Sequence, residues 1–192
     1  MDLTQGTQKE KNARAKKMML WFGIISLLMG FAGWTSAFIV SSVREDWLTD
    51  FQLPTAFFYS TAVIILSSFS YILAKSAVRK NEQKTAANWL IATLILGIVF
   101  IALQFMGFSE IIAQGYYFTG PTSNITMSYI FLIAAVHVLH VVAGIISLLV
   151  VLVSQLQRKY TPDNLLGMEL GATFWHFLDL LWVYLMLFFY FF

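Results

Sequence analysis

The chain has 192 residues, of which 59% are hydrophobic, 17% aromatic and only 11% charged, and its net charge is +2. This composition is too apolar for a soluble globular domain of this size and indicates a membrane protein. The absence of cysteine excludes disulfides, thiolate zinc sites, iron–sulfur clusters and thiolate-ligated haem. No basic cluster is interleaved with aromatic residues, so we expect no nucleic-acid partner.

A polar, basic tail, Met1 to Lys17, precedes five apolar stretches. Because the N-terminus is polar and the first apolar run is long, we expect no secretory signal. Each stretch is long enough to cross about 30 Å of hydrocarbon as a helix, and none alternates as a β-barrel strand does. We predict an all-α integral membrane protein, a bundle of five transmembrane helices that form one membrane domain over 18–192. The spans lie at about 18–42, 55–74, 86–108, 127–154 and 171–192.

Basic residues predict the orientation of this bundle. Five precede the first span, and the four connections that follow carry one, four, none and two in that order. Lysine and arginine are enriched in cytoplasmic connections, so the N-terminus is predicted to be cytoplasmic and the C-terminus outside. The longest outside connection, Ser109 to Thr126, is predicted to be an ordered surface turn.

The first span carries small residues on one helical stripe. Such a stripe lets another helix approach closely, either within the bundle or from a separate membrane subunit. Gly144 belongs to a similar small-residue face in the fourth span. The residues of the first stripe, at steps of three and four, are Gly23, Ser26, Gly30, Gly33 and Ala37.

Ionisable residues lie inside the last two spans, where they need partners and mark a functional or assembly site. His137 and His140 share one face of the fourth span. His176 and Asp179 share one face of the fifth span, and Glu169 comes just before the membrane. We predict that these five residues form an intramembrane polar network.

Three interpretations of this network remain open. Two histidines three residues apart cannot both be axial ligands of one haem, although a site with two histidines and one carboxylate could hold a metal. A proton relay would need a chain of groups that reaches both surfaces, and the fourth span has no carboxylate. We favour the third interpretation, in which hydrogen bonds of about 0.5–2 kcal/mol each hold the helices together.

The second half of the chain contains four distinctive segments: His137-Val-Leu-His140-Val-Val-Ala-Gly144, Arg158-Lys-Tyr-Thr-Pro162, Gly167-Met-Glu169 and Phe174-Trp175-His176-Phe177-Leu178-Asp179-Leu180-Leu181-Trp182. In this order and spacing they resemble subunit III of the haem–copper terminal oxidases, in the short five-helix form of many bacteria. The first half matches more weakly, by span count, by Met29-Gly-Phe-Ala-Gly33 and by Gln104.

The resemblance implies a subunit of an oxidoreductase complex of aerobic respiration, the cytochrome c oxidase type, with no catalytic centre, cofactor or metal of its own. Haem and copper would belong to the partner subunits. Subunit I would be the main partner, with subunit II and other respiratory subunits nearby, in the bacterial inner membrane. The implied roles are stabilising subunit I, holding phospholipid and supporting proton uptake for proton translocation. Arg158 is then a candidate contact for a lipid headgroup.

Two departures remove carboxylates that family members often carry. Leu27 follows Ser26 where a Ser-Glu pair is common, and Gly107 stands where many members have an acidic residue. Any proton-linked role of those carboxylates is therefore in doubt for this chain. The alternatives are subunit III of a quinol oxidase, a homologue associated with nitric-oxide reductase, or a stand-alone membrane transporter or enzyme that uses His176 and Asp179.

Overall fold

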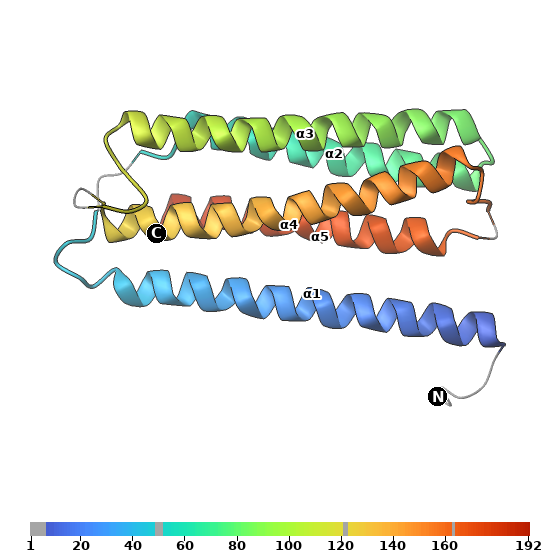
Figure 1. Ribbon diagram of the computed structural model, residues 1–192, viewed down its shortest axis with the longest axis horizontal. Helices are drawn as coiled ribbons and strands as arrows, with labels where there is room; N and C mark the ends of the chain where they lie inside the picture. The colour runs from blue at the N-terminus through green and yellow to red at the C-terminus, as the bar shows by residue number, and fades with distance from the viewer. Residues whose placement is uncertain (1–6, 49–51, 121–122, 163) are drawn as a thin grey trace.

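The computed structural model describes residues 7–48, 52–120, 123–162 and 164–192. Within these residues the chain is helical, apart from its connections and an isolated bridge between Thr161 and Asn164. Each helix is long and apolar enough to span a membrane, which confirms the predicted all-α membrane fold. The helices are α1 (Gln8–Ser41), α2 (Thr55–Arg79), α3 (Gln83–Ala113), α4 (Ile125–Leu156) and α5 (Leu166–Phe191) (Figure 1).

Each helix covers its expected span to within one residue and extends beyond it. The largest extension is at α1, which begins at Gln8 inside the expected polar tail; residues 1–6 of that tail lie outside the described residues. A capping box explains this start, because the Thr7 hydroxyl accepts from the Glu10 N–H while the Glu10 carboxylate accepts from the Thr7 N–H. At the other end of the bundle α3 continues to Ala113, so the connection to α4 is shorter than expected.

Helices α2, α3, α4 and α5 form a ring in which each helix contacts the next one around the ring. Helix α1 packs outside this ring, against α4 and α5 alone, as its separate position in Figure 1 shows. The largest fully buried side chains lie inside the ring and include Trp175, Trp182, Tyr71 and Phe57. Lipid is as apolar as these side chains, so close packing and interhelical hydrogen bonds must hold the ring together.

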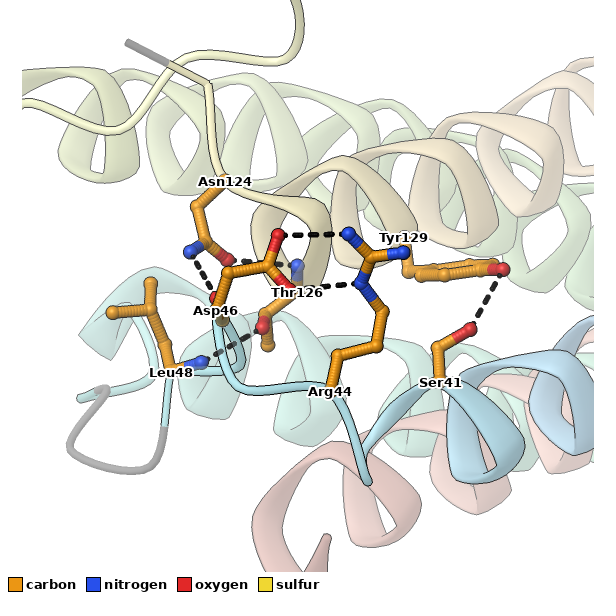
Figure 2. Close-up of polar contacts among 7 residues, drawn as sticks. All are labelled: Ser41, Arg44, Asp46, Leu48, Asn124, Thr126 and Tyr129. Atoms are coloured by element: carbon orange, nitrogen blue, oxygen red, sulfur yellow. Dashed lines mark hydrogen bonds and ion pairs between the residues drawn. The ribbon is translucent and has the colours of Figure 1, made fainter.

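The connection between α1 and α2 is tied to the start of α4 (Figure 2). The Asn124 side chain caps α4 by accepting from the Thr126 N–H, and its amide donates to the Asp46 carbonyl at 2.8 Å. The Thr126 hydroxyl in turn accepts from the Leu48 N–H at 3.1 Å. One helix N-terminus therefore fixes the connection that positions α1.

A bidentate ion pair stiffens the same connection. Arg44 Nε and Nη2 donate to the two carboxylate oxygens of Asp46 at 2.8 and 3.0 Å. The hydrogen bond from Arg44 lowers the pKa of the Asp46 carboxyl, and the same contact raises the pKa of Arg44. Both side chains are more than half exposed, so solvent screens the pair strongly.

Candidate functional site

The side chain of Trp175 on α5 organises the centre of the ring. Its indole N–H donates to Ser67 Oγ of α2 at 2.9 Å, and the residue is 1% exposed. A Cβ added to Gly97 of α3 would lie 2.8 Å from the indole, and one added to Gly144 of α4 would lie 3.4 Å from it. Glycine at these two positions makes room for the indole, so all four helices of the ring meet at this side chain.

Just beyond Trp175, His176 and Asp179 meet at Ser68 of α2. The Ser68 hydroxyl lies 2.9 Å from His176 Nδ1 and hydrogen-bonds with Asp179 Oδ2. Asp179 is 4% exposed, whereas His176 is half-buried. The imidazole and the carboxyl group that share one face of α5 are therefore joined through a hydroxyl that another helix contributes.

A serine, a histidine and an aspartate in contact invite comparison with a hydrolytic triad. In such a triad the histidine lies between the other two, where it can accept the serine proton while the acid orients its ring. Here Ser68 lies between His176 and Asp179, so this order does not produce an activated nucleophile. The arrangement can share a proton among three groups and can hold α5 against α2.

Two helical turns after Trp175, Trp182 repeats the contact with α2. Its indole N–H donates to Thr61 Oγ1 at 3.1 Å. The ring of His137 on α4 stacks on Trp182 with 5.2 Å between centroids, and Phe31 and Phe100 meet it edge-on. Within the described residues, neither nitrogen of His137 has a hydrogen-bond partner. Aromatic packing, and not a hydrogen bond to Asp179, holds this predicted network residue.

His140 lies one turn further along α4 and is half-buried. Its Nδ1 lies 2.7 Å from the Val136 carbonyl of its own helix, and its ring meets Phe31 edge-on at 5.7 Å. The structure thus brings His176 and Asp179 together and places His137 and His140 beside Phe31. Phe31 belongs to α1, so the two histidines lie where α1 meets α4.

Glu169, in the first turn of α5, lies among cations from two other helices. Its carboxylate is 3.2 Å from Lys17 Nζ of α1 and 3.9 Å from both Lys75 and Arg79 of α2. A negative charge is also favoured at a helix N-terminus. This carboxylate links α1 to the adjoining ends of α2 and α5. At 1.5 Å of rise per residue, it lies about 15 Å along α5 from Asp179.

The small-residue stripe of α1 faces away from the rest of the chain. Gly23, Ser26, Gly30 and Gly33 are exposed, and a Cβ added to any of the three glycines would meet nothing within 4 Å. Ala37, at the end of the stripe, is half-buried. The three glycines of the stripe therefore have no packing partner among the described residues, in contrast to Gly144.

The family model for cytochrome c oxidase subunit III matches residues 5–192. The chain belongs to the cytochrome c oxidase subunit III family. Subunit 3 of the cytochrome bo(3) ubiquinol oxidase of Pseudomonas aeruginosa is 35% identical over 133 residues, which are 69% of this chain and 62% of that protein. Cytochrome c oxidase subunit 3 of Cyprinus carpio is 33% identical over 141 residues, 72% of this chain and 49% of that protein.

A third relative, the probable quinol oxidase subunit 3 of Staphylococcus saprophyticus, is 28% identical over 135 residues, 70% of this chain and 65% of its own length. The chain thus spans about half to two thirds of the length of the curated relatives it matches. The names of these relatives divide between oxidases of cytochrome c and of quinol.

The structure gives a physical reason for one departure from the subunit III pattern. A Cβ added to Gly107 of α3 would overlap the ring of Phe57, which is fully buried on α2. An acidic side chain therefore does not fit at this position unless Phe57 moves. One turn earlier, Gln104 is fully buried and its amide donates to Ser60 Oγ at 2.9 Å. Leu27, at the site of the other departure, is half-buried on α1.

The serines and threonine of α2 that complete the site were missed in the sequence. Ser67, Ser68 and Thr61 all accept or share hydrogen bonds with α5. Their signal was present: two adjacent hydroxyl pairs, 60–61 and 67–68, lie seven residues apart and so share one face of the helix. Hydroxyl side chains in transmembrane helices commonly bond across to a neighbouring helix.

Arg158, the candidate lipid contact, is exposed and follows the end of α4 in a left-handed conformation with φ of 54°.

Metal ligation was the other open question. Across the described ranges, no three histidine, cysteine, aspartate or glutamate residues are grouped so that they could hold a metal ion.

Proposed function

We propose that the chain is the non-catalytic subunit III of a haem–copper terminal oxidase, in the bacterial inner membrane and with its N-terminus in the cytoplasm. The observation that carries this proposal is the family match, which extends over residues 5–192 and so includes all five helices. In this role the chain would contribute no redox centre. It would stabilise subunit I, hold phospholipid and support proton uptake.

The geometry supports a stabilising role. The residues that first suggested chemistry are bonded within the chain: His176 and Asp179 through Ser68, and Glu169 to Lys17. Each contact joins two helices. A stand-alone enzyme or transporter that uses His176 and Asp179 would need these groups to reach a substrate.

The outer face of α1 supports contact with another membrane subunit. Gly30 and Gly33 lie there with open space above them, and exposed small residues let a second helix approach closely. We propose that subunit I, the main partner, covers this face. Subunit II and other respiratory subunits would lie around that pair.

Two neighbouring pockets support lipid binding between α1 and α5. One, of about 230 Å³, is almost wholly apolar and is lined by Leu28, Phe31 and Phe177 among others. The second, of about 250 Å³, lies where Lys17 of α1, Lys75 of α2 and Glu169 of α5 meet. An acyl chain fits the chemistry of the first and a headgroup that of the second. Arg158 would contact a headgroup elsewhere at this end of the bundle.

Purification through an affinity tag on this chain in a mild detergent tests the proposal. We expect a larger haem protein to accompany the chain and to dominate the visible spectrum. Deleting the chain should leave initial turnover per haem largely intact but speed the loss of activity with time. Turnover with reduced cytochrome c and with quinol, measured separately, then identifies the electron donor. A chain that purifies alone, or haem in the isolated chain, contradicts the proposal.

A further inference from the structure

Among the acidic residues that the structure describes, Asp179 is the one that is buried. One oxygen, Oδ2, hydrogen-bonds with Ser68, and the other, Oδ1, has no partner among the described residues. The residue is 4% exposed and lies between helices that lipid surrounds. An ionised carboxylate offers about four acceptor positions, of which this site fills one.

Among the described residues, no lysine or arginine forms an ion pair with Asp179. On α2, Lys75 is seven residues from Ser68, about 10 Å along the helix, and it lies 3.9 Å from Glu169 instead. Lys17 of α1 also contacts Glu169. Among the described titratable groups, His176 shares Ser68 with Asp179, the ring of Tyr71 of α2 meets that of His176 edge-on, and His137 of α4 stacks on Trp182, one turn after Asp179. Burying an unpaired charge costs several kcal/mol, and the group then takes up a proton instead.

The single proton of Ser68 decides how the three groups bond. If Ser68 donates to Asp179, then His176 must donate to Ser68, and the carboxylate keeps a full negative charge with one oxygen unpartnered. If Asp179 carries a proton and donates to Ser68, then Ser68 donates to His176 Nδ1. The second arrangement leaves all three groups neutral and forms the same two hydrogen bonds at the observed contacts.

We propose that Asp179, Ser68 and His176 form a proton-binding site in which Asp179 is a neutral carboxylic acid. The Asp179 Oδ2–H donates to Ser68 Oγ, the Ser68 O–H donates to His176 Nδ1, and His176 carries its own proton on Nε2. A shift along this line would move the Asp179 proton to Ser68 and the Ser68 proton to His176. The products would be a carboxylate and an imidazolium, so the site stays neutral overall. This proposal does not depend on which complex the chain belongs to.

Infrared spectroscopy of the complex, purified with whatever subunits accompany the chain, tests the proposal. Growth on aspartate labelled with ¹³C at the side-chain carboxyl shifts every aspartate band. In the difference between wild type and Asp179→Asn, we expect the loss of one labelled band of a protonated carboxyl. Asp46→Asn is the matched control, because the Asp46 carboxyl is exposed and paired with Arg44. That variant should lose carboxylate bands alone.

Asp179→Glu keeps the experiment informative if Asp179→Asn does not assemble. The protonated-carboxyl band should persist in this variant but should no longer shift with labelled aspartate. Ser68→Ala should retain the acid band and move it to the frequency of a less hydrogen-bonded carboxyl. The proposal would be overturned if Asp179→Asn lost carboxylate bands instead. It would also be overturned if the protonated-carboxyl band stayed the same in Asp179→Asn, Asp179→Glu and Ser68→Ala.

Discussion

Replacing Trp175 by phenylalanine should loosen the centre of the four-helix ring. The change removes the indole N–H that donates to Ser67, and interhelical hydrogen bonds in membranes average about 0.6 and reach about 1.7 kcal/mol. The smaller ring also leaves a cavity beside Gly97 and Gly144. At about 24 cal/mol per Å³, a cavity of a few tens of Å³ costs about 1 kcal/mol. We expect a total loss of roughly 1.5–3 kcal/mol in the free energy of unfolding.

Because the chain has no cysteine, a single cysteine at the fully buried Ala134 of α4 provides the assay. The cysteine reacts with maleimide only when the chain unfolds, so its labelling rate, measured in mild detergent with increasing amounts of a denaturing detergent, reports unfolding. A double-mutant cycle with Ser67→Ala isolates the hydrogen bond, with an expected coupling of about 0.6–1.7 kcal/mol. Trp21→Phe, at an exposed position of α1, is the control and should change little. A coupling near zero, or equal losses at Trp175 and Trp21, would refute this account.

The remaining predictions concern glycines, pH and orientation. Gly97→Leu should destabilise the isolated chain, because the new side chain overlaps Trp175. Gly30→Leu should leave the stability of the isolated chain unchanged and reduce the co-purification of partner subunits. Equal effects of the two variants on stability and on co-purification would contradict this prediction. Since Arg44 lowers the pKa of Asp46, the pair stabilises the fold above the unfolded pKa, and this contribution is lost as pH falls below roughly 4. Thermal unfolding of Asp46→Asn should therefore depend less on pH in that range than that of wild type, and identical acid profiles would count against the pair. A membrane-impermeant maleimide applied to intact cells should label Glu45→Cys and not Glu82→Cys; the reverse pattern would invert the predicted orientation.

The five helices were predictable because crossing lipid requires long apolar runs, and such runs stand out in any sequence. The start of α1 was not predicted, since charged residues such as Lys9 and Arg14 end the apolar run although they form helix readily. Thr7 and Glu10 had the spacing of a capping box, which was the available signal. Length and hydropathy therefore locate a span, whereas capping locates the end of a helix.

The site was only partly predictable, because periodicity places residues on a face of one helix but does not say which helix meets that face. His176 and Asp179 were expected to share a face, and both contact Ser68. His137 shares a face with His140, yet Trp182 and Phe31 surround it where the sequence suggested a hydrogen-bonded network. Which hydroxyl meets which carboxyl depends on the register between α2 and α5, and a single sequence does not contain that information.

The two classes of glycine in this chain show how the fold and the proposed assembly are related. The side chains of Trp175 and Leu178 occupy the space beside Gly97 and Gly144, and this packing holds the four helices of the ring together. No side chain of the described residues occupies the space beside Gly30 and Gly33 on α1. Helix α1 is held to the ring by the Lys17–Glu169 ion pair and by the buried rings of Phe31 and Phe38, which pack against α4 and α5. Toward its C-terminal end, Ser41 hydrogen-bonds with Tyr129, and Thr35 accepts a hydrogen bond from Tyr184. Because lipid supplies no hydrophobic force between helices, close packing of a second partner on the open face of α1 would add contacts that the described chain does not make there. The proposed contact with subunit I is therefore supported by the glycines of α1, which have no packing partner in the described chain, whereas those of α3 and α4 do.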